Sequence, residues 1–232
     1  VTAIATAIGT DDALHLFAGV HGGVFISKDT GITWTPIGLL SPPPFVTALA
    51  MSPNYIADGI ALASTLEDGV FRTDDFGRTW QQWGFGLFDH NVLGLVIAPD
   101  FSRSKAVYAL TETGIYYSQN TGRSWQVTDF PAEAAPILCM AISPAFAQDG
   151  RLYCGTEADG LYCSDDRGQS WRRLDQLGIQ DTINAILLDQ QYPDQPEVLV
   201  MTDHALWYSS DAGESWENLH NDLDFSEGLT AA

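Results

Sequence analysis

The stretch that organises this chain is Thr73-Asp74-Asp75-Phe76-Gly77-Arg78-Thr79-Trp80, which we call the motif. Its pattern is a hydroxyl residue, Asp or Asn two positions on, Gly two positions later, then a second hydroxyl residue followed by Trp. Four further copies lie at 27–34, 118–125, 164–171 and 209–216. The closing residues Trp34, Trp80, Trp125, Trp171 and Trp216 are 46, 45, 46 and 45 residues apart. A constant period of this length is typical of propellers and other repeat architectures, so the chain is one repeated module.

The residue types of the motif predict a tight turn. An Asp or Asn side chain can accept hydrogen bonds from nearby backbone N–H groups, and Gly can take a positive φ. Asn120 replaces Asp in the third copy, which keeps the acceptor and loses the charge. The motif is therefore predicted to be structural and not a metal site. The predicted structural residues are Asp29, Gly31, Trp34, Asp75, Gly77, Trp80, Asn120, Gly122, Trp125, Asp166, Gly168, Trp171, Asp211, Gly213 and Trp216.

Each repeat also contains short runs typical of strands. In the second repeat these are 46–51, 60–65 and 70–73, bounded by turn residues, and a fourth run follows the motif. No window has a sustained period of 3.6 residues. Four antiparallel strands per repeat predict an all-β, five-bladed β-propeller. We expect a single domain over 1–232, with blades near 1–45, 46–91, 92–136, 137–182 and 183–224 and a tail at 225–232.

Alignment of the repeats predicts the packing of the blades. Third strands carry an aromatic residue, and second strands are expected to place mostly small residues opposite it. The expected pairs are Phe25 with Ala18, Phe71 with Ser64, Tyr116 with Ala109, Tyr162 with Gly155 and Trp207 with Val200. First strands have a small third residue, which predicts crowding at the central axis: Ala3, Ala48, Gly94, Cys139 and Ala185. Leu229-Thr230-Ala231 reads like the start of another first strand, either the stub of a sixth blade or a strand that competes for closure.

The motif resembles the Asp-box, or BNR repeat, and the resemblance covers the whole chain. Sialidases are enzymatic relatives, and the resemblance implies that their chemistry lies on the face opposite the motifs. That chemistry needs three converging arginines, a Tyr nucleophile and an acid. The sequence places no arginine in the turns or linkers of that face, and it lacks the Phe/Tyr-Arg-Ile-Pro motif of sialidases. Sialidase activity is therefore not expected.

The chain is also similar to photosystem II assembly factors, which are Asp-box propellers without known catalysis. Those proteins have seven blades and an arginine-rich binding patch, which this acidic five-repeat chain lacks. Only a scaffold role is implied by this second resemblance.

Composition narrows the partner classes. Ten basic and thirty acidic side chains give a formal charge of −20, which disfavours nucleic acid and anionic membrane surfaces. The sequence has no apolar stretch long enough for a transmembrane helix and no signal-peptide pattern, so membrane insertion is not expected. We predict a protein or glycan partner, no cofactor and no metal. Export, a cytoplasmic location and the oligomeric state remain open.

The three cysteines lie in the fourth repeat. A two-residue turn at Ala158-Asp159 would place Cys154 directly opposite Cys163. Cα atoms at such a site are about 4.5 Å apart, near the lower limit for a disulfide. The alternatives are a cross-strand disulfide in an exported protein and two small buried thiols. Cys139 is expected to be structural.

Candidate binding residues come from the turns and linkers at the edge opposite the motifs. From the turns they are His21, Glu67, Asp68, Glu112, Glu157, Asp159, Asp203 and His204, and from the linkers Trp83, Phe85, Phe88 and His90. The favoured function is a non-catalytic binding or scaffold propeller, with no catalytic residues assigned. One alternative is a glycoside hydrolase or carbohydrate-binding protein that uses the acidic turns. Another is a structural subunit of a larger assembly. For the linker aromatics, a plug between blades is favoured over an exposed patch.

Overall fold

A computed structural model of the chain describes residues 1–10, 12–38, 43–174 and 181–219. Within these residues the chain forms five four-stranded antiparallel sheets with almost no helix, which confirms the all-β class and the five propeller blades. Two compact units carry them: Val1–Val127 holds the first three blades and Thr128–Ala232 the last two. Closure of the blades into one domain over 1–232 stays a prediction. The predicted tail and its Leu229-Thr230-Ala231 stub lie outside the described residues.

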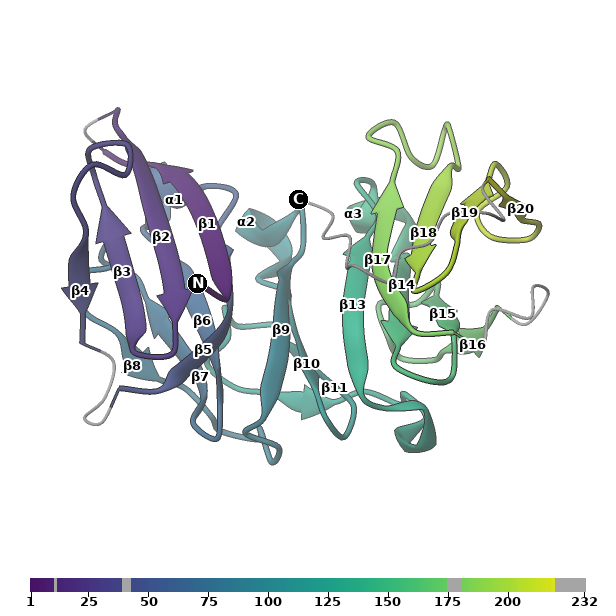
Figure 1. The fold of residues 1–232 in the computed structure, drawn as a ribbon, viewed down its shortest axis with the longest axis horizontal. Helices are drawn as coiled ribbons and strands as arrows, with labels where there is room; N and C mark the ends of the chain where they lie inside the picture. Colours follow the sequence, from purple (N-terminus) through teal and green to yellow (C-terminus); the bar gives the residue numbers. More distant parts are fainter. Residues whose placement is uncertain (11, 39–42, 175–180, 220–232) are drawn as a thin grey trace. The chain divides into compact units, whose positions relative to one another are not determined.

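Every blade is a meander in which consecutive strands pair (Figure 1). The first blade has β1 (Ala3–Ile8), β2 (Leu14–Val20), β3 (Gly23–Ser27) and β4 (Thr35–Ile37). The second has β5 (Phe45–Met51), β6 (Ala61–Leu66), β7 (Gly69–Thr73) and β8 (Gln81–Gln82). The third has β9 (Val92–Ile97), β10 (Val107–Thr111), β11 (Ile115–Ser118) and β12 (Gln126–Val127). The fourth has β13 (Ile137–Ile142), β14 (Leu152–Thr156), β15 (Leu161–Ser164) and β16 (Arg172–Arg173). The fifth has β17 (Ile183–Leu188), β18 (Val198–Thr202), β19 (Leu206–Ser209) and β20 (Glu217–Asn218).

Short helical turns join first to second strands in the middle three blades. They are α1 (Tyr55–Asp58), α2 (Phe101–Ser104) and α3 (Phe146–Asp149), and a 3-10 turn η1 (Ala132–Ala134) precedes β13. The first residue of each α turn is a buried aromatic. One turn is too short to show a helical period in the sequence, which is why none was expected. In the described part of the chain, no helix is long and apolar enough to span a bilayer.

The hydrophobic core lies between neighbouring blades of each unit. Between the first and second blades, Phe17, Val46 and Phe71 are almost fully buried in one cluster. Side chains of β6, β7, β9 and β10 form a second cluster, and residues of the fourth and fifth blades form a third. Because buried side chains of neighbouring sheets share these clusters, the blades stabilise one another by stacking.

Inner strands of neighbouring blades are also joined by polar contacts. The hydroxyl of Thr2 donates to the carbonyl of Val46 at 2.5 Å, and the hydroxyl of Thr47 donates to the carbonyl of Val92 at 2.5 Å. Small residues permit this approach: a Cβ on Gly19 would lie 2.5 Å from Val46 Cγ1. Gly19 belongs to β2, so this contact shows crowding between β2 and β5, and crowding of the first strands at a central axis stays a prediction.

All five motifs have one hydrogen-bond pattern. The first hydroxyl donates to Oδ1 of the Asp or Asn at 2.8–3.0 Å and accepts the Gly N–H at 2.8–3.1 Å. The same Oδ1 accepts the N–H of the second hydroxyl residue at 2.8–2.9 Å. In four copies that residue's hydroxyl also donates to Oδ2. In the third copy, Asn120 Nδ2 donates to Ser124 Oγ instead. An amide can therefore replace the carboxylate, because only the direction of this one hydrogen bond changes.

The motif backbone contains two consecutive left-handed residues. The Gly has φ of 79–90°, as the sequence predicts, and the residue before it has φ of 58–65°. The second group consists of Thr30, Phe76, Thr121, Arg167 and Ala212. Non-glycine residues rarely adopt this conformation, so the Asp or Asn hydrogen bonds must stabilise it. The residue types at this position gave no sequence signal for it.

The turns between second and third strands correct the predicted register in two blades. Ala18, Ala109 and Val200 face Phe25, Tyr116 and Trp207 as expected. In the second blade Phe71 faces Ala63 instead of Ser64, and in the fourth Tyr162 faces Cys154 instead of Gly155. These two hairpins have three-residue loops, 66–68 and 157–159, each followed by a glycine with positive φ, Gly69 or Gly160, whereas the others have two-residue loops. One additional loop residue shifts the pairing by one position.

The shifted register also overturns the predicted cysteine pair. Cys163 faces Tyr153 and Cys154 faces Tyr162, so the two cysteines point to opposite faces of the sheet. Cys139, Cys154 and Cys163 are all free thiols. The alternative of buried thiols holds for Cys154 and Cys163, and Cys139 is partly buried at the inner strand.

Candidate functional site

In the first unit, the edge opposite the motifs brings two predicted acidic residues near one side chain. Asn91 Oδ1 accepts the backbone N–H of Glu67 at 3.1 Å, and Asn91 Nδ2 donates to Glu112 Oε2 at 3.1 Å. Asn91 precedes β9, so the linker between blades connects the turn of the second blade to the turn of the third. Asn91 was not predicted from the sequence, because a single amide in a linker has no distinguishing pattern.

Asp89 strengthens this connection. Its Oδ2 accepts the hydroxyl of Thr113 at 2.7 Å and the N–H of Thr113 at 3.0 Å, and its Oδ1 accepts the Asn91 N–H at 3.0 Å. Partial burial acts to raise the pKa of Asp89, but the hydrogen bonds from Thr113 and Asn91 outweigh it and lower the pKa. The carboxylate is therefore a fixed acceptor at this edge.

The linker that carries Asp89 is held at several points. Trp83 N–H donates to Val70 O at 2.9 Å, Trp125 N–H donates to Phe85 O at 2.8 Å, and Gly69 N–H donates to His90 O at 3.0 Å. Gly86 has a φ of 82°, and a Cβ there would lie 2.1 Å from the carbonyl oxygen of Trp125. Only glycine fits at this contact, so the linker path is closely determined.

On this anchored linker two aromatic side chains face solvent. Phe85 is 82% exposed and Phe88 is 87% exposed, whereas Leu87 between them is 2% exposed. The plug between blades is therefore Leu87, and the favoured interpretation of the two phenylalanines was wrong. Both are exposed aromatic side chains on one linker, as the alternative held, and Asp89 follows Phe88 directly.

Other predicted residues of this unit have separate surroundings. The carbonyl of Asp68 accepts Gln82 Nε2 at 2.7 Å. The ring of Trp83 lies 5.9 Å from the guanidinium of Arg123, and His21 lies edge-on to Phe45 at 5.1 Å. None of these contacts adds a further carboxylate to those of Glu112 and Asp89 at Asn91.

In the second unit the predicted turn residues form ordinary structural contacts. Asp159 accepts a hydrogen bond from the hydroxyl of Tyr162 and lies 2.9 Å from Arg173 Nη1. Asn184 Nδ2 donates to Asp203 Oδ1 at 2.7 Å, which lowers the pKa of Asp203. The other two predicted residues donate hydrogen bonds from their backbone N–H groups. Glu157 donates to Pro136 O, and His204 donates to Thr202 Oγ1. Arg173 belongs to an outer strand, so its reach to this turn was not visible in the sequence.

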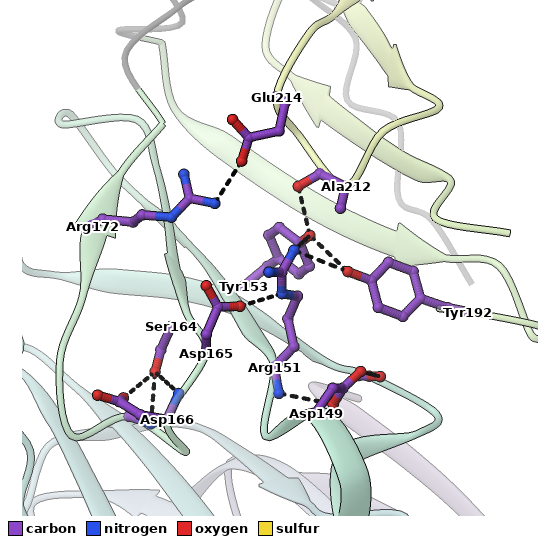
Figure 2. Close-up of polar contacts among 12 residues, drawn as sticks. Asp149, Arg151, Tyr153, Ser164, Asp165, Asp166, Arg172, Tyr192, Ala212 and Glu214 are labelled. Atoms are coloured by element: carbon purple, nitrogen blue, oxygen red, sulfur yellow. Dashed lines mark hydrogen bonds and ion pairs between the residues drawn. The ribbon is translucent and has the colours of Figure 1, made fainter. Parts of the chain in front are cut away.

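The densest polar cluster of the second unit joins the fourth and fifth blades at the motif edge (Figure 2). The guanidinium of Arg151 contacts Asp165 and donates to the hydroxyls of Tyr153 and Tyr192, each at 3.2 Å. The two hydroxyls lie 3.1 Å apart, and Tyr153 donates to the carbonyl of Ala212 at 2.8 Å. Nearby, Arg172 and Glu214 form an ion pair at 2.9 Å across the same two blades.

This cluster combines tyrosine and arginine, as sialidase chemistry does, but it is closed. Tyr153 is fully buried and Tyr192 is 4% exposed. Burial raises the pKa of Tyr153, so the nucleophilic phenolate is suppressed. Burial alone would lower the pKa of Arg151, but its contacts with the tyrosines and Asp165 raise it. The cluster therefore joins the fourth and fifth blades through two buried tyrosines.

A glycosidase would need a pair of carboxyl groups, one of them a general acid. Among the described residues, each carboxyl with a clearly displaced pKa has it lowered: Asp29, Asp75, Asp89, Asp166, Asp203 and Asp211. A general acid in a glycosidase needs a raised pKa. No group of three or more potential metal ligands converges in the described residues.

No family model and no curated protein matches the chain. Among solved structures, a GH74 xyloglucanase from Xanthomonas campestris is 22% identical with a TM-score of 0.64, covering 91% of this chain but only 37% of its own. YCF48 bound to a D1 peptide is 18% identical with a TM-score of 0.64, covering 98% of this chain and 68% of its own. A chain of the nidogen/laminin complex is 14% identical with a TM-score of 0.62, covering 88% and 77%. At these identities the likeness concerns the propeller fold alone.

Proposed function

We propose that the chain is a non-catalytic binding propeller of the Asp-box type that engages a protein partner at the edge opposite the motifs. The observation that carries the proposal is the exposure of Phe85 and Phe88 on an anchored linker. Exposed aromatic side chains on a preorganised surface favour association because they bury large apolar area at a small entropic cost.

Charge supports a basic partner segment. Asp68 and Asp89 lie along the same linker and turn, and Glu67 and Glu112 flank Asn91. The whole chain carries a formal charge of −20. Acidic side chains around an aromatic pair complement a partner with Lys or Arg beside an apolar anchor, and long-range attraction would speed the encounter.

The relatives of the fold include binders and enzymes, which leaves two alternatives. YCF48 is bound to a D1 peptide in its structure, which supports protein binding as a use of this fold. The GH74 xyloglucanase supports the glycosidase or carbohydrate-binding alternative. A structural subunit of a larger assembly is the second alternative, and it would need extensive apolar contacts between chains.

Affinity capture from the source organism tests the proposal. The bait is the wild-type chain, the test variant is Phe85→Ser/Phe88→Ser, and the control is Ile32→Ser, which replaces an apolar residue that is 79% exposed in the first motif. We expect one partner to be captured by wild type and control and lost with the double variant. Equal capture by all three chains would refute the proposed surface.

A glycan array and aryl glycosides separate the alternatives. Glycan binding that disappears in the phenylalanine double variant would replace the protein partner with a sugar. Turnover that is abolished by Glu67→Gln, Glu112→Gln or Glu157→Gln would establish the glycosidase instead.

A further inference from the structure

A groove of about 570 Å³ lies between the first two blades at the motif edge, away from the proposed binding linker. Its apolar lining includes Ile26, Ile37 and Phe76, and its cationic lining consists of Lys28 and Arg78. A volume of this size and an apolar lining with a few charged groups are typical of small-ligand sites.

The next pair of blades shows why the groove is open. Trp83 follows the motif tryptophan by three residues in the second blade, as Ile37 does in the first. Trp83 pairs with Val70, and Ile37 pairs with the corresponding Val24. In the second blade the large ring lies beneath the guanidinium of Arg123 at 5.9 Å. In the first blade the smaller isoleucine holds this position and lines the groove.

The charges at the two positions differ as well. Asp74 is the second residue of its motif and lies 3.6 Å from Arg123, the sixth residue of the next motif. The same two positions one blade earlier hold Lys28 and Arg78. Two cations therefore replace an ion pair, and within the described residues neither has an acidic partner within salt-bridge distance. Both side chains are exposed.

One carboxylate also lines the groove. Asp29 accepts three hydrogen bonds within its own motif, from Thr33 N–H at 2.8 Å, Thr33 Oγ1 at 2.5 Å and Ser27 Oγ at 2.8 Å. With two cations and one carboxylate, the lining keeps a net positive charge in a chain of net charge −20. An anion is thus favoured at this place although the rest of the surface repels it.

We propose that this groove is a binding site for a small organic anion with a flat apolar body, whose acid group pairs with Lys28 and Arg78. The apolar body would lie on Ile37 and Phe76, where Trp83 fills the corresponding space of the next blade. The guanidinium can hold a carboxylate through two parallel hydrogen bonds, and the ammonium adds a point charge.

The test is a titration of the protein with 2-naphthoate. Binding is measured by calorimetry and by changes of amide chemical shifts in the NMR spectrum. We expect saturable binding with shift changes at Gly38, Gly77 and Arg78. The neutral 2-naphthalenemethanol should bind about tenfold more weakly, since it lacks the charge-assisted contacts. Inorganic sulfate alone should not saturate the site.

Three variants identify the groove. Arg78→Gln removes one cation, Lys28→Asp recreates the ion pair of the next blade, and Ile37→Trp fills the apolar space. Each should weaken 2-naphthoate binding about tenfold or more. The control Arg103→Gln removes an exposed cation in α2, and it should leave binding unchanged, which separates a local site from a net-charge effect.

Circular dichroism of each variant shows whether the fold is retained. Lys28 and Arg78 are exposed, so we expect their substitution to leave the fold unchanged. The proposal is overturned if 2-naphthoate does not saturate, if the neutral analogue binds equally well, or if Arg78→Gln and Ile37→Trp both keep wild-type affinity.

Discussion

The hydroxyl oxygens of Tyr153 and Tyr192 lie 3.1 Å apart between the fourth and fifth blades. Tyr153 also donates to Ala212 O at 2.8 Å, so Tyr153→Phe leaves a carbonyl without its donor. We expect the free energy of unfolding to fall by about 1–3 kcal/mol, measured by urea denaturation. Tyr192→Phe removes only contacts to Arg151 and Tyr153 and should cost less. A Tyr153→Phe variant as stable as wild type would contradict the role given to this cluster.

Asp75 accepts hydrogen bonds from Thr73, Arg78 and Thr79. Asp75→Ala should lower stability by about 0.5–1.5 kcal/mol for each bond lost. Asp75→Asn should cost much less, because Asn120 forms the corresponding contacts in the third motif. Thermal unfolding of the two variants side by side measures the difference, and equal losses would show that charge matters more than geometry.

The tryptophans of the motifs should differ in importance. Trp80 is 8% exposed, and Trp80→Ala should cost about 3–5 kcal/mol because it leaves a cavity in the core. Trp34 is 40% exposed, so Trp34→Ala should cause a smaller loss. Chemical denaturation of both variants provides the comparison. A larger loss for Trp34→Ala would contradict the burial difference.

Acid should destabilise the protein through its motif carboxylates. Hydrogen bonds from Thr33 and Ser27 lower the pKa of Asp29 from 3.8 to about 2. Because the folded pKa lies below the unfolded one, the stabilisation is complete above about pH 4 and is lost as the pH falls toward 2. Asp29→Asn should make the acid dependence of the urea midpoint shallower, and Asn120→Asp should make it steeper. Identical pH profiles for the two variants would refute this linkage.

The cysteines should be unreactive in the folded protein. Burial raises the pKa of Cys163 to about 11 and that of Cys139 to about 12, and Cys154 is raised as well, so little thiolate exists at neutral pH. A thiol reagent such as DTNB should label the native chain slowly and label three thiols in denaturant. Fewer than three in non-reducing denaturant would reveal a disulfide and contradict the free thiols.

The repeated sequence pattern predicted those features of the fold that depend on residues close together in the chain. The spacing of Trp34 and Trp80 predicted the blades, and the Asp75 and Gly77 pattern predicted the turn. Pairing across hairpins was predicted correctly only where the loop has two residues, as at Ala18 and Phe25. In the second and fourth blades Gly69 and Gly160 follow three-residue loops, and the sequence does not distinguish such a loop from a shorter turn plus one strand residue.

The candidate sites were harder to predict because they depend on contacts between repeats. Phe85 and Leu87 are both apolar linker residues, and only the path of Gly86 against Trp125 decides which is buried. Likewise, Lys28 and Arg78 are 50 positions apart, and only stacking of the blades places both along one groove.

The hydrogen bonds between inner strands limit which insertions and deletions the repeated chain can tolerate. Thr2 bonds the carbonyl of Val46, and Thr47, one repeat later, bonds the carbonyl of Val92. Donor and acceptor types are the same at both joints. Removal or duplication of the second repeat, 46–91, would therefore bring together a threonine and a valine carbonyl again. Insertions of any other length would mismatch them, so gene rearrangements are expected to be tolerated here only in units of complete blades.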